Sequence, residues 1–189
     1  MSAPVTIPNA ADKRLWAKSS LKVYTKIEDG ATLKYVGKTQ PEVLFNPGEE
    51  AAEWFDNTEG TQVLYAVDPD KIDPKVTFRF MQIAHPGLLA LAINANTIDD
   101  TDPNKYVLYK GSLASAYIEA EWHFVGKTLN GDTMTLVIPN GICQPMAEDM
   151  TFGTPGAYQD APLVIRALQD TSLATDRDLY YWELPKLGS

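Results

Sequence analysis

Cysteine and histidine are scarce in this sequence, which has one cysteine, Cys143, and two histidines, His85 and His123. A single cysteine cannot form an internal disulfide, which fits folding in a reducing compartment. The longest uninterrupted apolar run, Leu88 to Ile93, is far shorter than the roughly 20 residues that a helix needs to span a bilayer. The first residues lack the apolar segment of a secretory signal. We therefore expect no disulfide, no membrane-spanning segment and no secretory signal.

Lysine and arginine are absent from Thr39 to Asp70, a stretch that holds eight carboxylates. Residues 1–38 have seven basic and three acidic residues, a net charge of +4, whereas the remainder has 9 basic and 22 acidic residues, a net charge of −13. Tight binding to DNA needs lysine and arginine to displace counterions from the phosphates. DNA can pass such a surface, but we expect no tight or sequence-specific binding. In many proteins, an acidic composition has no role other than to increase solubility.

The patterns that resemble known catalytic or metal sites each lack a required residue. The Gly-Lys-Thr stretches that end at Thr39 and Thr128 lack the glycine that a phosphate-binding loop places five residues before the Gly-Lys pair. The aspartate-rich stretch 100–104 is followed by Lys105, where a calcium loop requires glycine. No Gly-x-Ser-x-Gly elbow is present, and no histidine is near Cys143 in sequence. We expect no catalytic residue, cofactor or metal ion, and we interpret the protein as a non-enzyme.

One row of polar residues is the best candidate for a metal or acid–base site. Glu119, Glu121 and His123 alternate with apolar residues in the segment 117–125. On a β-strand this spacing separates their side chains by roughly 7 Å along the strand. That separation suits a sheet face better than a coordination sphere. We interpret the row as a polar strand face directed to solvent or to the lumen of an assembly.

Alternation of apolar and polar residues predicts short β-strands throughout the chain. The strand signals lie at 21–27, 32–36, 62–67, 75–83, 106–109, 117–125, 133–138, 163–168 and 179–184. One segment, 85–95, is convincingly helical, and it is too short to be stable unless it packs against a sheet. The pattern predicts a mainly β fold: an antiparallel β-sandwich or barrel with one flanking α-helix.

The 189 residues are expected to form a single domain, with an extended arm at 1–19 and a β-sandwich core at 20–185. Between the second and third predicted strands lies a long acidic loop at 38–60, with a short strand at 42–45 and a helical turn at 49–55. Loops of this length are usually functional.

The order of the predicted elements is more informative than any single motif. The predicted order is a strand, a turn, a second strand, the acidic loop, an aromatic strand, the short helix and a late strand. In that order, the residues that form these elements are Lys22–Tyr24, Asp29-Gly30, Lys34–Gly37, 38–60, Val76–Phe80, Leu88–Ala95 and Tyr158–Leu168. This order resembles the tail tube protein of long-tailed bacteriophages, a family related in fold to contractile tail tubes and secretion-system tubes. The resemblance covers about residues 20–185.

The resemblance implies a structural virion protein that forms hexameric rings, stacked into a tube through which DNA is delivered into the host. It implies assembly in the host cytoplasm, location in the virion tail, and tape-measure, tail terminator and baseplate or tail-tip proteins as partners. Joining sheets between subunits removes exposed strand edges, and head-to-tail stacking grows a filament. A negatively charged lumen lets DNA slide because its phosphates find no cationic anchors.

The uneven charge along the chain indicates how rings could stack. We expect basic residues of the arm in one ring to meet the acidic loop of the next, namely Lys13, Arg14 and Lys18 against Glu49, Glu50, Glu53 and Glu59. Exposed ion pairs contribute only about 0–1 kcal/mol each, but they repeat around a ring.

Two other classes of protein share this strand pattern. A head–tail joining protein or a capsid decoration protein should form a single ring or trimer and never a filament. A carbohydrate-binding module or a sandwich-fold hydrolase needs aromatic side chains gathered on one face, which here means Trp16, Trp54, Trp122 or Trp182. A hydrolase also needs two carboxylates across a cleft, whereas Glu119 and Glu121 share one strand.

Overall fold

The computed structural model describes residues 17–26, 32–37, 39–56, 63–81, 86–112, 117–145, 149–150, 160–174 and 178–185. These residues form a mainly β fold of antiparallel sheets with one helix, α1 (Pro86–Ile93), which confirms the predicted fold class. In this part of the chain no helix has the length and apolar character needed to cross a membrane.

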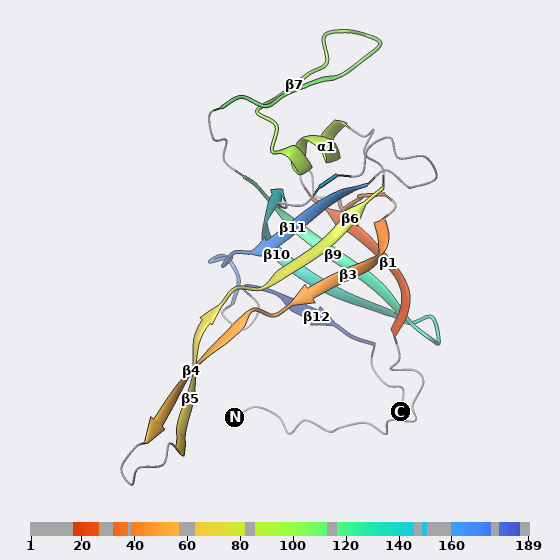
Figure 1. Cartoon of the computed structure of the whole chain (residues 1–189). Helices are drawn as coiled ribbons and strands as arrows, with labels where there is room; N and C mark the ends of the chain where they lie inside the picture. Colours follow the sequence, from red (N-terminus) through yellow and green to blue (C-terminus); the bar gives the residue numbers. More distant parts are fainter. Residues whose placement is uncertain are drawn as a thin grey trace.

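The main sheet is an open barrel (Figure 1). Its strands run in the order β2 (Lys34–Tyr35), β1 (Ala17–Thr25), β9 (Ile118–Thr128), β10 (Thr133–Pro145), β11 (Ala161–Ala167), β6 (Lys75–Phe80) and β3 (Thr39–Asn46). An eighth strand, β12 (Tyr181–Glu183), pairs with the first half of β10. The sheet curls so far that β1, the second strand in this order, contacts β3, the last strand.

Two hairpins lie outside the barrel, at opposite ends of the molecule (Figure 1). The longer one consists of β4 (Glu49–Asp56) and β5 (Val63–Ile72), which continue the paths of β3 and β6. The shorter one consists of β7 (Thr97–Asp99) and β8 (Val107–Tyr109) and lies beyond α1.

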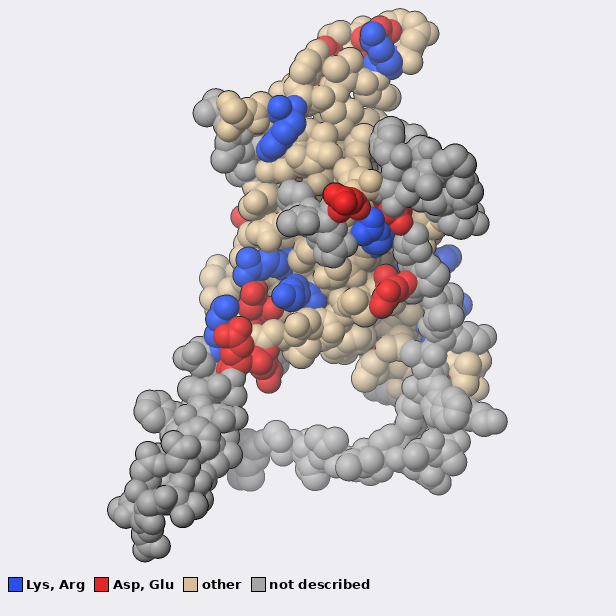
Figure 2. All heavy atoms as spheres, in the orientation of Figure 1, with Lys and Arg blue, Asp and Glu red and all other residues tan. Residues whose placement is uncertain are grey.

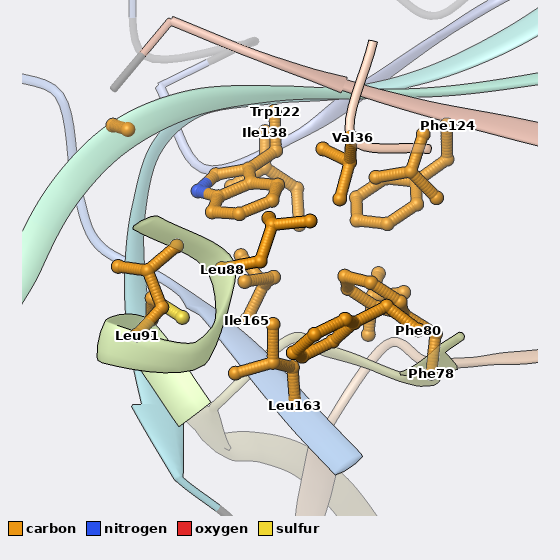
Figure 3. Packing of buried hydrophobic residues seen from close by; sticks show 14 of the residues in the cluster. Val36, Phe78, Phe80, Leu88, Leu91, Trp122, Phe124, Ile138, Leu163 and Ile165 are labelled. Carbon is orange, nitrogen blue, oxygen red and sulfur yellow. The ribbon is translucent and has the colours of Figure 1, made fainter. Parts of the chain in front are cut away.

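The core of the barrel consists of side chains from strands in which buried residues alternate strictly with more exposed ones. On β6, Val76, Phe78 and Phe80 are buried while their neighbours are not. The ring of Phe78 lies 5.9 Å from that of Phe124 and 6.3 Å from that of Trp122 on β9, measured between centroids. Leu88 and Leu91 of α1 close one end of this cluster (Figure 3). The helix is thus stabilised by the sheet, as its short length requires.

Strand β10 changes partner half-way along its length. Thr135–Val137 pair with β12, and Gly141–Pro145 pair with β11. At this point a Cβ on Gly141 would lie 2.6 Å from Ile165 Cγ2 and 2.8 Å from Trp122 Cδ1. Glycine is therefore required for the strands and the core tryptophan to approach this closely.

The predicted long loop at 38–60 is wrong, because β3 and all of β4 lie within it, although the short strand predicted at 42–45 is part of β3. The predicted helical turn at 49–55 is part of β4. Proline and clustered carboxylates suggested a loop, but Pro41 falls at a register shift of β3, where a missing N–H is tolerated. Strand β5 also continues past residue 67 to Ile72, and β1 begins at Ala17, inside the predicted arm.

Candidate assembly surface

The long hairpin leaves the barrel at a tight crossing of two chain segments. Gly48 has a φ of +67°, and a Cβ there would lie 1.9 Å from the carbonyl oxygen of Asp73. The amide of Asp73 donates to the carbonyl of Gly48 at 2.9 Å, and the amide of Gly48 donates to Asn46 Oδ1 at 2.8 Å. Only glycine accommodates both the left-handed conformation and the close approach of the backbones.

An ion pair fixes this crossing to the main sheet. On β11, Arg166 Nη2 donates to both carboxylate oxygens of Asp73 at 2.7 and 2.8 Å, and its Nε donates at 3.0 Å. The amide of Ala167 also donates to the carbonyl of Pro74 at 2.9 Å. Multiple charge-assisted hydrogen bonds from a planar guanidinium fix the orientation of the bound carboxylate as well as its distance. The base of the hairpin is therefore held in a defined orientation on the barrel.

The hairpin beyond this base has open backbone edges. Among the described residues, β4 and β5 pair with each other from Glu49–Ile72 to Asp56–Val63 and with no other strand. The outer edge of each strand thus presents backbone N–H and C=O groups that can pair with another chain.

The residues predicted to join stacked rings are only partly within the described structure. Lys13, Arg14 and Glu59 lie outside it. For Lys18 in β1 and Glu53 in β4, only the backbone is described. Glu49 and Glu50 are exposed at the start of β4, beside the crossing. Glu50 Oε1 is 3.7 Å from Lys71 Nζ of the same hairpin.

Acidic and basic side chains are mixed where the hairpin leaves the barrel (Figure 2). They include Glu50, Lys71, Asp73 and Arg166. The acidic surface that the sequence predicted is therefore interrupted by cations at this point. The expected contact between the arm and the acidic residues of another ring stays a prediction.

The polar row of β9 divides into two separate groups. Glu119 is exposed and accepts a hydrogen bond from Asn140 Nδ2 at 3.3 Å. Glu121 accepts from Lys26 Nζ at 2.6 Å, and its other oxygen lies 2.5 Å from His123 Nε2. Glu121 and His123 are thus in contact, closer than the roughly 7 Å expected from strand spacing, because their side chains bend toward each other.

These contacts change the acidity of Glu121. Burial raises the pKa of Glu121, but the hydrogen bonds and charges of Lys26 and His123 outweigh burial and hold the pKa below the ordinary 4.5. The group is a small ion network that joins β1 to β9 rather than an open acid–base pair. Within the described residues, no group of three or more His, Cys, Asp or Glu side chains is placed to hold a metal ion.

The other candidates with described side chains are Cys143, Trp122 and Trp182, whereas the side chains of Trp16 and Trp54 lie outside the described part of the structure. Cys143 lies in the core, and burial raises the pKa of its thiol to about 12. Trp122 is fully buried, so its ring is not available to a sugar. Trp182 is 43% exposed and packs edge-on against Phe45, with 5.8 Å between ring centroids.

The hairpin base is the feature that sequence reasoning missed. Its signals were Pro47-Gly48 and Asp73-Pro74, two turn-like pairs that the structure brings together. Compared with known proteins, the chain matches no protein-family model, and no curated protein matches it.

Proposed function

We propose that this protein is a structural subunit that assembles with copies of itself into stacked hexameric rings, the tail tube of a long-tailed bacteriophage. In the virion the tube would conduct DNA toward the host. The observation that carries this proposal is the β4–β5 hairpin, which projects from the barrel on a fixed base and has no third strand on either edge among the described residues.

The energetics of the hairpin favour a partner. An isolated two-stranded hairpin is marginally stable in water, and three or more strands are needed for independent stability. A neighbouring copy that pairs with β4 or β5 supplies the missing strand. Because Arg166 and Asp73 fix the base, the hairpin meets every neighbour in the same orientation.

The positions of the two hairpins allow head-to-tail growth. The β4–β5 hairpin and the β7–β8 hairpin lie at opposite ends (Figure 1), so the two ends of the molecule are different surfaces. Contacts between unlike surfaces are heterologous and produce rings or filaments. The net charge of −9 suits a conduit for DNA, because 25 carboxylates outnumber 16 lysine and arginine residues and repel the phosphates.

Removal of the hairpin tests this proposal. Residues 49–72 would be replaced by Asn-Gly, which joins Gly48 to Asp73. The bond between the Gly48 carbonyl and the Asp73 amide then becomes the closing hydrogen bond of a β-turn. Because β4 and β5 pair only with each other among the described strands, the barrel should keep its fold.

We expect the deletion variant to be folded and monomeric under conditions in which the full chain forms rings or tubes. Light scattering after size exclusion measures the assembly, and circular dichroism checks the fold. Lys71→Ala is the matched control, since it removes only an exposed contact of 3.7 Å within the hairpin. A folded deletion variant that still forms tubes contradicts the proposed role of the hairpin. Closed rings of the full chain that never stack indicate a joining protein instead.

A further inference from the structure

Exposed apolar side chains gather at the end of the molecule opposite the β4–β5 hairpin (Figure 1). Eleven large hydrophobic residues are exposed in the described structure, and five of them lie in the β7–β8 hairpin or at the start of β9, at this end of the barrel. We call these five the tyrosine patch: Ile98, Tyr106, Tyr109, Tyr117 and Ile118. Exposed apolar surface that is concentrated in this way marks a site of interaction with another molecule.

The β7–β8 hairpin presents its part of this patch from a fixed base. The amide of Asn96 donates to the carbonyl of Tyr109 at 2.7 Å, and the amide of Gly111 donates to Asn96 Oδ1, also at 2.7 Å. Lys110 Nζ donates to the carbonyl of Asn94, just beyond α1, at 2.7 Å. Because α1 packs in turn on β10 and β11, the hairpin is held in a defined position on the barrel.

The charges at the two ends of the molecule allow these ends to contact each other. The segment 97–110 has three aspartates and two lysines, a net charge of −1. At the base of the long hairpin, Glu50 lies beside Lys71, and Asp73 is paired with Arg166. Both ends are therefore close to neutral in a chain whose net charge is −9, so neither end strongly repels the other.

The base of the long hairpin also offers an exposed apolar side chain. Ile72, the last residue of β5, is 50% exposed and lies opposite Glu49 of β4. It directly precedes Asp73, whose hydrogen bonds with Arg166 fix this end of the hairpin. An aromatic ring that covers Ile72 removes apolar surface of both side chains from water, which stabilises the contact. In a head-to-tail stack the two unlike ends of neighbouring copies face each other.

We propose that the tyrosine patch of one copy packs on the base of the β4–β5 hairpin of the next copy, with Tyr106 against Ile72. Tyr106 is the most exposed member of the patch, at 59%. This contact rests on the function proposed above, in which copies stack head to tail, and it forms the stacking interface. Each copy uses the tyrosine patch at one end and the hairpin base at the other, so the stack can grow without closing.

Two variants block the two ends separately. Tyr106→Asp places a charge in the tyrosine patch, and Ile72→Asp places one at the hairpin base; both side chains are exposed, so the fold should remain. We expect each variant alone to form single rings and to need about tenfold or more protein to stack, as expected for loss of an interface hot spot. Electron microscopy counts the rings in each particle.

A matched control separates the position from the charge. Leu129 is 40% exposed at the β9–β10 turn, so Leu129→Asp adds the same charge to another exposed apolar residue. It should stack at the wild-type concentration. Circular dichroism checks the fold of every variant, and Tyr106→Ser and Ile72→Ser replace a charged variant that does not fold.

Mixing preformed rings of the two variants tests whether the contact joins unlike ends. A Tyr106→Asp ring keeps an intact hairpin base, and an Ile72→Asp ring keeps an intact tyrosine patch, so one ring of each kind can join. The joined pair then presents only blocked ends. We therefore expect double rings in the mixture and no longer particles.

Each other result overturns the proposal. Variants that stack at the wild-type concentration refute this contact but leave the proposed assembly standing, whereas wild-type protein that forms neither rings nor tubes refutes both. Double rings of Ile72→Asp alone show that two tyrosine patches meet, and a mixture that stays as single rings shows that the unlike ends do not. Folded variants that form no rings place the residue in the ring contact instead. Equal loss of stacking in Leu129→Asp shows a non-specific effect of charge.

Discussion

Replacement of Gly48 by alanine should destabilise the protein through two effects that the structure separates. The first is the left-handed conformation, with φ at +67°, which costs an L-residue about 1–2 kcal/mol. The second is the collision of the new Cβ with the carbonyl of Asp73, which would be 1.9 Å away. Forced overpacking costs about 1–3 kcal/mol, so the total loss in unfolding free energy is about 2–5 kcal/mol.

Gly131 provides the matched control, because it has a φ of +92° and no atom within 4 Å of an added Cβ. Gly131→Ala should therefore cost only the conformational part, about 1–2 kcal/mol. Urea unfolding of both variants, followed by circular dichroism, measures the two free energies. The Gly48 variant should lose clearly more stability than the Gly131 variant. Equal losses would refute the close crossing at the hairpin base.

Three further predictions follow from the described contacts. Gly141→Ala should lower the unfolding free energy by about 1–3 kcal/mol, because its Cβ meets Ile165 and Trp122; an unchanged urea midpoint would show that these contacts are absent. The pKa of Glu121 is lowered in the fold, so its ionised form stabilises the protein above pH 4.5 and that contribution is lost as the pH falls through the folded pKa. The stability advantage of wild type over Glu121→Gln should therefore shrink in acid, and an advantage that grows in acid contradicts the network with Lys26. Because burial raises the pKa of the Cys143 thiol to about 12, a disulfide reagent at neutral pH should label it only in denaturant; rapid labelling of the folded protein contradicts its burial.

Strands that are half buried could be predicted from the sequence, because burial of one face makes apolar and polar residues alternate along the strand. On β6 and β9 the apolar positions of this alternation include Phe78, Trp122 and Phe124, which are buried in the core. Ile118 occupies an apolar position of the same alternation, but it is 42% exposed at the start of β9. The helix was also predicted within two residues of its observed ends.

The hairpin was predicted only in part, since the strand signal at 62–67 covers the start of β5 but β4 was missed. Its strands lie outside the barrel, so no core imposes alternation on Glu49–Asp56, and the carboxylates there suggested a loop. The contact between Arg166 and Asp73 joins positions 93 residues apart, which no local pattern encodes. The contact between Glu121 and His123 depends on side-chain torsions, which strand spacing leaves undetermined.

Electron microscopy of the purified full chain over a series of concentrations tests self-assembly most directly. The account predicts hollow rings of uniform width that stack into tubes as the concentration rises, with six subunits per ring in averaged end views. Particles that stay monomeric at every concentration, even when tail-tip proteins are added as nuclei, would contradict it.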